Sequence, residues 1–531
     1  MNRAFKPPTW QANRRLLITG AVIYTPQYGF TAAAPNSLLV DRGIITWIGN
    51  DAVKYRDDAD TVVDVEGAFV LPGFVDAHVH TTNTGIILMG LDLSATTSLV
   101  EALTLISAAA KSARGGVLIG HGWDETRWPE GRAPTRTEVD RATWGSVAYL
   151  SRIDVHSAVA SSALLAALPG IEQVAGYRAD GLLSRSAHHL AREKALDSIG
   201  SGQRASAHRI TRSHASAHGI VSMHEMAGPT ISSSDDLREL LELAAHEPGP
   251  MVTGYWGELA SQGGIERAKE LGAVGVAGDL FIDGALGSRT ACLRSHYEDE
   301  PSTEGAQYVT AEEIEDHVIR ATETGLQAGF HVIGDKATDI VITGFRAAAS
   351  RCGAEAIQAG AHRLEHAEML DDDHIAAMND LGITASMQSM FDSLWGAPGG
   401  MYQQRLGAIR AAKMNRLADI SSAGVLLALG SDSPVTVMDP WLAVRAATQH
   451  HQPKQRLSFD VAIKAHTEGG WAAAGTSGVG QLVVGAPAHL AIWESQESTG
   501  PVLDLSAGGP SCLRTIVSGA TVFDNGSLAE Q

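Results

Sequence analysis

The sequence predicts an α/β protein built around a (β/α)8 barrel, also called a TIM barrel. Apolar segments of strand composition alternate with amphipathic helical segments through the middle of the chain, and eight such strands can be counted. Both ends of the chain instead read as strands joined by glycine turns. Several of the predicted barrel strands end in histidine or aspartate. Because parallel barrel strands end at one face, these residues indicate a functional site there.

The strand-rich ends are the first elements of this prediction. "RLLITGAVIYT", "SLLVDRGIITWIGN" and "TVVDVEGAFVL" are rich in Val, Ile, Leu and Thr, and Asp41-Arg42-Gly43 predicts a hairpin turn. Near the other end, "AHLAIWE" (488–494) and "LRTIVSGATVFDNG" (513–526) have the same composition. We expect short strands at both ends of the chain.

The barrel strands follow from residue 73 onward. They are predicted to begin at Gly73, Gly219, Met251, Gly278, Gly329, His362, Ile383 and Val425. Helical segments such as "SSDDLRELLELAAHE" and "AEEIEDHVIRATETG" lie between them and start with residues suited to an N-cap. The interval after the first strand is too long for one helix, so residues 95–215 are predicted to include an inserted lobe. "SVAYLSRID" and "SSALLAALP" are its predicted strand and helix.

Composition and charge exclude several classes of protein. Of the 531 residues, 40 are Lys or Arg and 60 are Asp or Glu, which gives a formal net charge of −20. Such a surface repels phosphate backbones and anionic lipids, so we expect neither nucleic acid nor membrane as a partner. Three widely spaced cysteines argue against a disulfide framework or thiolate metal site. With no signal peptide or long apolar span, the expected location is cytoplasmic.

The residues best suited to bind a metal lie at the ends of the predicted strands. The first predicted strand ends in His78 and His80, whose i, i+2 spacing places both side chains on one face. His331, His366 and Asp432 end the fifth, sixth and eighth strands. A single histidine at a strand end is more often a hydrogen-bonded core residue. The coincidence of these positions favours a site for a divalent transition metal, which prefers nitrogen and carboxylate ligands.

The motifs around these residues resemble the amidohydrolase superfamily. The matching segments are "LPGFVDAHVH", "FHVIGD", "RLEHAE" and "GSDSP". "GHGWDETRWPEGRAPTRTEVD", "SRIDVHSAVASSALL" and "DGALGSRTA" resemble more narrowly a long-chain branch that includes N-substituted formamide deformylases. The resemblance implies a small composite β-sandwich from residues 1–72 and 485–531. It also implies a barrel from 73–484 that contains the inserted lobe.

The resemblance also implies a ligand set. His78, His80 and Asp432 would hold the more buried metal, while His331 and His366 would hold a second metal or orient water and substrate. In close relatives the fourth strand supplies a carboxylated lysine that bridges two metals, and here Asp279 stands at the matching position. The shorter aspartate can bind one metal without bridging two, or simply cap a turn. We therefore expect one firmly held ion, with zinc the best match, and leave a second ion open.

The predicted function is metal-dependent hydrolysis of a non-peptide C–N bond in a small amide, N-formyl or N-acyl substrate. In this hypothesis metal-bound hydroxide attacks, Asp432 shuttles the proton, and His366 or His331 stabilises the developing oxyanion. A deaminase or cyclic-amide hydrolase is the alternative enzyme. A catalytically silent binding or regulatory protein is a third hypothesis, which the retained metal ligands disfavour.

Four residues are candidates for substrate binding, each with a structural alternative. Trp123 is predicted either to cover the pocket or to pack the lobe onto the barrel. His224 would lie at the rim or make a strand-end hydrogen bond, and Arg289 would bind a carboxylate or form a salt bridge. Phe391 would line an apolar pocket or belong to the core. By analogy with other barrels, a homodimer is a candidate assembly.

Overall fold

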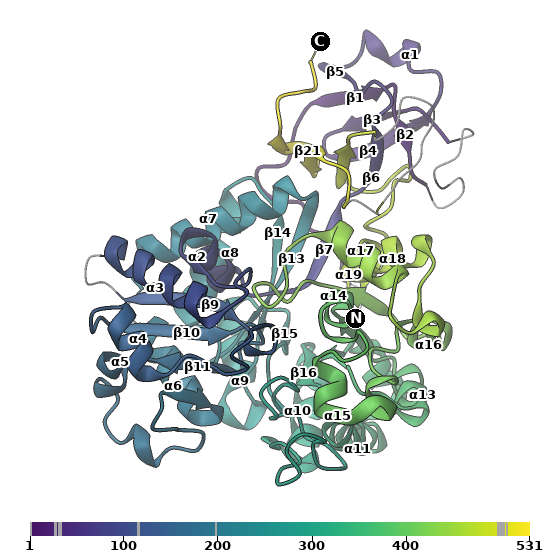
Figure 1. Cartoon of the computed structure of the whole chain (residues 1–531). Helices are drawn as coiled ribbons and strands as arrows, with labels where there is room; N and C mark the ends of the chain where they lie inside the picture. Colours follow the sequence, from purple (N-terminus) through teal and green to yellow (C-terminus); the bar gives the residue numbers. More distant parts are fainter. Residues whose placement is uncertain are drawn as a thin grey trace.

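The computed structural model describes residues 3–25, 29, 34–113, 117–196, 199–495, 505 and 508–530. Figure 1 shows a barrel, a lobe on one side of it and a small strand-rich unit that contains the C-terminus. The lobe comes from the first half of the chain, whereas the small unit combines both ends. The predicted (β/α)8 fold class, with separate sheets from the termini, is confirmed.

Eight parallel strands form the barrel in the order β19-β18-β17-β16-β15-β14-β13-β7. They are β7 Phe74–Val79, β13 Ile220–Ala227, β14 Met251–Trp256, β15 Gly275–Val276, β16 Gln327–Val332, β17 Arg363–His366, β18 Thr384–Met387 and β19 Leu427–Leu429. The last and first strands meet through the segment after β19, where Asp432 N donates to His78 O at 2.8 Å and His80 N to Ser433 O at 2.9 Å. This closure brings His78, His80 and Asp432 to one end of the barrel.

The fourth strand differs from its prediction. The sequence predicted a strand over 278–284, but β15 ends at Val276 and the chain then turns at Gly278, whose φ is +88°. Asp283 holds the following segment against β16 by accepting hydrogen bonds from Ile333 N (3.0 Å) and Gly334 N (2.8 Å). Asp279 therefore projects from a loop at the mouth of the barrel.

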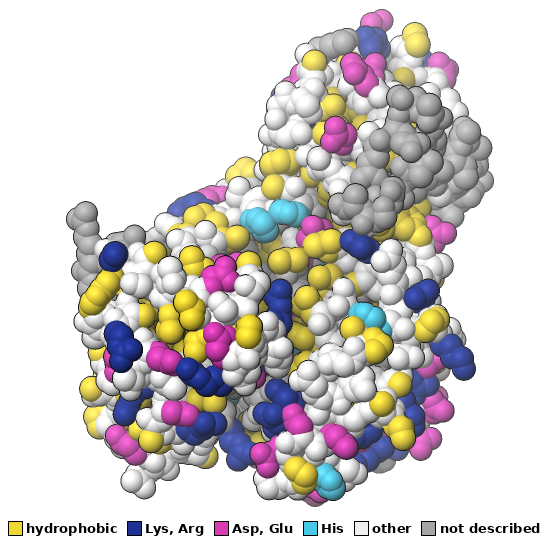
Figure 2. All heavy atoms as spheres, in the orientation of Figure 1, with side chains coloured by type: hydrophobic (Ala, Val, Ile, Leu, Met, Phe, Trp, Pro, Cys, Tyr) yellow, Lys and Arg dark blue, Asp and Glu magenta, His cyan; other side chains and the backbone are white. Residues whose placement is uncertain are grey.

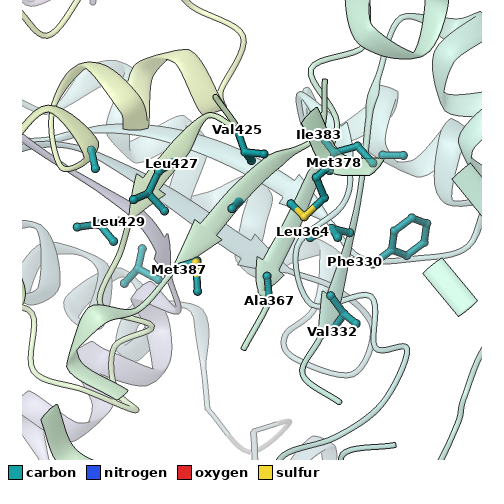
Figure 3. Packing of buried hydrophobic residues seen from close by; sticks show 14 of the residues in the cluster. Phe330, Val332, Leu364, Ala367, Met378, Ile383, Met387, Val425, Leu427 and Leu429 are labelled. Atoms are coloured by element: carbon teal, nitrogen blue, oxygen red, sulfur yellow. The ribbon is translucent and has the colours of Figure 1, made fainter. Parts of the chain in front are cut away.

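Helices surround the barrel and bury its outer face. They are α7 Ser201–Ala217, α8 Ser234–His246, α9 Gly264–Leu271, α10 Ala311–Thr324, α11 Asp335–Cys352, α12 Ala354–Ala359, α13 Asp372–Leu381, α14 Ser389–Trp395, α15 Met401–Ala411, α16 Leu417–Ser422, α17 Pro440–Thr448, α18 Phe459–Ala465 and α19 Glu468–Ala473. Figure 3 shows part of the apolar layer, in which Phe330 and Leu364 from two neighbouring strands lie near Met378 of α13. Burial of this layer is the main source of stability.

The lobe follows β7 and contains a five-stranded sheet in the order β12-β11-β10-β9-β8. Its strands are β8 Leu91–Asp92, β9 Leu118–Trp123, β10 Ala148–Arg152, β11 Ser157–Ala160 and β12 Leu182–Ser184. Its helices are α3 Leu99–Ala113, α4 Arg136–Ala142, α5 Ser162–Ala166 and α6 Arg185–Leu196. Helix α2 (Thr81–Met89) connects β7 to the lobe and packs against α7. The lobe therefore begins immediately after His80.

Two further sheets lie outside the barrel and the lobe, and the second of them combines strands from both ends of the chain. One contains β4 Ile44–Gly49, β3 Ser37–Asp41, β1 Arg15–Thr19 and β5 Thr61–Asp64. The other contains β2 Val22–Ile23, β6 Phe69–Pro72, β20 Leu490–Trp493, β21 Cys512–Val517 and β22 Ala520–Asp524. The short helix α1 (Val53–Arg56) lies between β4 and β5 in the sequence. The predicted turn at Asp41-Arg42-Gly43 does join antiparallel strands, and Arg42 and Gly43 both have positive φ.

The passage from β6 into the barrel depends on Gly73. Gly73 N donates to His489 O at 3.0 Å, and a Cβ at this position would lie 2.1 Å from Val221 Cγ1. Only glycine allows the junction between β6 and β7 to lie this close to Val221 of β13. Across the helices that the structure describes, none is both long and apolar enough to cross a membrane.

Candidate metal centre and active site

Six side chains converge at the carboxyl end of the barrel strands, and all are almost fully buried. They are His78, His80, Asp279, His331, His366 and Asp432. The His-x-His segment supplies two of them, and the ends of β16 and β17 supply His331 and His366. The structure thus brings together all the residues that the sequence predicted as metal ligands.

Asp279 lies at the centre of this cluster. Its Oδ1 lies 3.6 Å from His78 Nε2, 3.4 Å from His331 Nδ1 and 3.7 Å from His366 Nε2. Its Oδ2 lies 3.1 Å from His80 Nε2. The carboxylate therefore faces four histidines, so it occupies the position of a shared ligand and does not cap a turn.

Asp432 contacts the same cluster through two of these histidines. Its Oδ1 lies 3.5 Å from His78 Nε2 and 3.2 Å from His80 Nε2. Asp432 and His366 have φ values of +54° and +67°, in the left-handed region that side-chain-bearing residues rarely adopt. Such a conformation costs about 1–3 kcal/mol and is kept where surrounding contacts impose it. Here the backbone bond to His78 O helps to hold Asp432 in place.

The cluster has the properties of a cation site. His78 Nε2, Asp279 Oδ1, His331 Nδ1, His366 Nε2 and Asp432 Oδ1 are all buried and lack hydrogen-bond partners. Two sets of ligand atoms lie within 4.8 Å of one another: those of His78, His80 and Asp432, and those of His78, Asp279 and His366. Buried polar atoms are normally satisfied. Imidazole and carboxylate ligands that converge without partners fit a divalent transition metal.

The charges in the cluster make metal binding depend on the protonation of its histidines. Burial lowers the pKa of His80, but the adjacent carboxylates of Asp279 and Asp432 outweigh it and raise the pKa to about 10. The pKa of His366 rises to about 9, with burial opposing and Asp279 and Asp432 raising it. Burial alone would raise the pKa of Asp279, yet the surrounding histidines hold it well below its usual value. A metal must therefore displace protons from the histidines when it binds.

Hydrogen bonds behind the cluster orient two of the histidines. His78 Nδ1 lies 2.9 Å from Glu365 Oε2, and His366 Nδ1 lies 2.8 Å from Gln388 Oε1. In both cases Nε2 is left to point into the cluster, which is the arrangement typical of metal-binding histidines. Sequence reasoning did not identify Glu365 or Gln388. The alternating polar residues of "HRLEH", inside an otherwise apolar barrel, were the available signal for Glu365.

Glu365 is in turn held by a buried arginine. Arg363 Nη2 donates to Glu365 Oε2 at 2.9 Å, to Ser386 Oγ at 2.8 Å and to Ala77 O at 2.6 Å. Burial would raise the pKa of Glu365, but Arg363 lowers it to about 2. His224 Nδ1 lies 3.1 Å from Arg363 Nη1 inside the barrel. The predicted rim position of His224 is therefore wrong, and its alternative as a hydrogen-bonding strand residue describes it.

The other substrate-binding candidates occupy different places. Phe391 stacks on the His366 ring, with centroids 5.9 Å apart and an interplanar angle of 12°. Trp123 packs inside the lobe and donates from Nε1 to Leu150 O at 2.7 Å. Arg289 forms an ion pair with Asp299 at 2.8 Å. Only Phe391 lies against the cluster, whereas Trp123 and Arg289 take the structural roles given as their alternatives.

A small cavity and a larger groove lie over the cluster. The cavity is bordered by His331, His366, Asp432 and Phe391, and by His156, whose ring centroid lies 5.0 Å from that of His331. His156 is a further candidate residue that sequence reasoning missed, although it lies within "SRIDVHSAVASSALL". The groove adjoins the cavity through three shared residues, Trp395, Met401 and Val435. Figure 2 shows a hollow between the lobe and the opposite side of the barrel, with charges of both signs around it.

Comparison with known proteins identifies the family. The profile of the amidohydrolase family matches residues 61–523, which includes the whole barrel and all six clustered side chains. The chain belongs to the amidohydrolase family. It is a hydrolase of that superfamily, and the resemblance predicted from its motifs is confirmed.

Individual members of the amidohydrolase family are similar along most of the chain. YtcJ of Bacillus subtilis (strain 168), an amidohydrolase by name, is 28% identical over 82% of this chain and 85% of its own. The N-substituted formamide deformylase of Arthrobacter pascens is 24% identical over 96% and 98%, respectively. An uncharacterized metal-dependent hydrolase from Pyrococcus furiosus has a similar structure, with a TM-score of 0.70 and 26% identity over 90% of this chain and 98% of that one. At such identities the deformylase branch stays a prediction.

Proposed function

We propose that this amidohydrolase cleaves a non-peptide C–N bond, such as an amide, N-formyl or N-acyl bond, in a small molecule. The observation that carries the proposal is the set of buried histidine and carboxylate atoms that converge without partners. Similarity to a deformylase over nearly the full length supports the type of bond. Zinc is the metal that best fits this combination of nitrogen and oxygen ligands.

His78, His80 and Asp432 would hold the ion, with Asp279 available to it from the other side. When bound, a divalent ion of this kind lowers the pKa of water toward about 7 and polarises a carbonyl group. Asp432 is placed to accept the proton that the attacking water gives up and to return it to the leaving nitrogen. Its Oδ1 is the oxygen closest to His78, whereas its Oδ2 lies 3.9 Å from His366 Nδ1 and would be available for this transfer.

His331 and His366 would contact the reacting carbonyl group. Both lie at the wall of the small cavity, where the substrate must enter to reach Asp432. Burial and the neighbouring His366 lower the pKa of His331. A neutral imidazole at this position can donate one hydrogen bond to an oxyanion that forms in the transition state. Phe391, stacked on His366, limits how far that ring can turn.

A substrate screen tests the proposal. Purified protein grown with zinc is assayed against formamides, N-acyl amines, cyclic amides and aminated heterocycles. We expect release of amine from the first two groups. Turnover of only the last two groups would instead indicate a cyclic-amide hydrolase or a deaminase.

The Asp432→Asn variant provides the mechanistic control. It keeps the shape of the side chain but removes the proton acceptor, so we expect kcat/KM to fall by about 10²–10⁴-fold. The zinc content of the variant is measured alongside, because lost metal would mimic lost catalysis. Turnover that survives Asp432→Asn at near wild-type levels would eliminate Asp432 as the proton shuttle.

A further inference from the structure

A narrow cavity lies between α2 and the sheet of the lobe, beside the metal cluster. Its lining includes Asn83 and Ile87 of α2, Tyr149 of β10, Arg192 of α6, and Pro434. Asn83 follows His80 by three residues, and Pro434 follows Asp432 by two. The cavity also shares Ile87, His121 and Pro434 with the groove that leads to the active site. It therefore adjoins the proposed substrate path.

Arg192 is the unusual residue in this lining. Its side chain is 5% exposed, yet it forms no hydrogen bond or ion pair with any residue that the structure describes. Its guanidinium nitrogens reach open space and are not enclosed by packed atoms. Arg192 lines both this cavity and a larger pocket that also includes Glu193, Asp235 and Asp236. Buried charges in proteins are almost always paired. A buried guanidinium that faces a cavity and has no counter-ion provides a place where an anion can bind.

The polar groups around Arg192 do not supply that anion. Tyr149 Oη is bonded to His188 Nε2 at 2.7 Å, and Ser151 Oγ lies 2.9 Å from His121 Nδ1. His121 Nε2 lies 2.8 Å from Pro434 O, so this nitrogen carries the proton and Ser151 donates to Nδ1. These neighbours are neutral and already bonded to one another.

Three acids of the lobe are occupied elsewhere. Asp154, Asp124 and Glu125 all bind Arg152, with nitrogen–oxygen distances of 2.9–3.0 Å. Histidines dominate the other side of Arg192. Burial, then His189 and then Arg192, lowers the pKa of His188 well below its usual value. Burial and Arg192 lower the pKa of His189 to about 4. The acids that line a second pocket with Arg192, among them Glu193, Asp236 and Glu258, form no ion pair with it in the part of the chain that the structure describes, so its guanidinium has no carboxylate partner.

We propose that this cavity is an oxyanion subsite in which Arg192 binds a carboxylate group. A guanidinium presents parallel N–H donors that match the two oxygens of a carboxylate. The chain as a whole carries a net charge of −20 and repels anions, so binding one requires a local cation of this kind. The carboxylate belongs either to the substrate, in which case the inference rests on the proposed function, or to a separate small anion. The shared groove favours the substrate.

A matched pair of ligands tests the subsite without relying on turnover. N-acetylglycine and its primary amide differ only in the carboxylate, and both are titrated calorimetrically into zinc-loaded protein. We expect the acid to bind at least about tenfold more tightly than the amide. Arg192→Gln should abolish this preference and Arg192→Lys should keep part of it. Lys194→Gln, which removes an exposed charge from the same helix, should leave it unchanged.

Two further arms identify the source of the anion. If the substrate carries the anion, kcat/KM is higher for carboxylated than for neutral substrates in the wild type. The ratio of these two kcat/KM values then falls in Arg192→Gln. If the anion is separate, acetate alone raises the Tm of the wild type but not of Arg192→Gln, and turnover shows no such ratio. An acid preference in binding with no hydrolysis would refute the proposed function and leave the subsite standing. Equal binding of acid and amide, together with no Arg192-dependent effect of acetate, would overturn the subsite.

Discussion

Asp279 faces four histidines because the chain turns sharply after the short strand β15. Had the strand continued to residue 284, alternate side chains would have pointed into the packed barrel wall. The turn at Gly278 and the anchoring of Asp283 to the segment after β16 instead lift Asp279 over the barrel end. At the scale of single residues, the cluster thus depends on loop geometry as much as on ligand chemistry.

The buried pair of Arg363 and Glu365 makes stability depend on pH. The pKa of Glu365 is depressed to about 2 in the folded protein, so its contribution is present above about pH 4.5 and is lost as the pH falls toward 2. Glu365→Gln removes this contribution and leaves Arg363 unpaired, which we expect to cost about 3–5 kcal/mol near neutral pH. The Tm difference between wild type and variant should then shrink as the pH is lowered.

This prediction is checked by thermal unfolding of chelator-treated proteins between about pH 6 and about pH 3. Glu355→Gln, at an exposed position on α12, serves as the control and should track the wild type throughout. A Glu365→Gln gap that stays constant or widens as the pH falls would contradict the assignment of a depressed pKa to this carboxyl group.

The ligands themselves were predictable from the sequence, whereas their supports were not. The i, i+2 spacing of His78 and His80 has a geometric meaning on any strand, and His331, His366 and Asp432 follow recognisable strands. Arg363, Glu365 and Gln388 act through contacts between strands that lie close only in the folded barrel. Likewise, the sequence presents Trp123 and Phe391 alike, as large aromatic residues near the predicted site. Only the fold shows that Trp123 packs inside the lobe and that Phe391 lies beside His366.

At the scale of elements, helix α2 links the metal cluster to the lobe. His80 is its N-cap residue, and Gly85 lies where α2 crosses α7. A Cβ on Gly85 would lie 2.2 Å from Ala207 O, so the two helices can approach only because this residue is glycine. The position of His80 therefore depends on the packing of two helices.

Gly85→Ala should consequently separate α2 from α7. We expect a loss of about 1–3 kcal/mol in stability from the clash, together with a lower zinc content as His80 shifts. Gly202→Ala is the matched control, because Gly202 is also helical but a Cβ there meets nothing within 4 Å. That variant should be neutral or gain up to about 1 kcal/mol. Tm and zinc content of both purified variants provide the measurement, and similar values for the two would refute this account of α2.

Element order was easier to predict than element boundaries. Eight strands separated by helices were countable because buried parallel strands are nearly continuous apolar runs. The fourth strand was misplaced because "GDLFIDG" has strand composition, while Gly278 and the hydrogen bonds of Asp283 direct that segment into a loop. An apolar composition indicates that a segment is buried, and not that it is a strand. Residues 278–284 are mostly buried but do not form a strand.

At the scale of the whole molecule, the two chain ends stabilise the barrel from one side. Trp493 of β20 lies with its ring centroid 5.8 Å from Phe74 of β7 and 5.2 Å from Trp441 of α17. These contacts join the C-terminal strands to the strand that carries the His-x-His pair. The groove and cavity at the cluster are instead lined by residues of the lobe and of the barrel, so these two parts of the chain enclose the active site.

The central claim is that the converging histidines and aspartates hold a catalytic metal. The most direct test is the metal content of the protein, purified after growth in zinc and measured by elemental analysis, beside a His78→Ala/His80→Ala double variant. We expect about one or more equivalents of zinc in the wild type and a loss of most of it in the variant. Less than about 0.2 equivalents of transition metal in an active wild-type protein would contradict this claim.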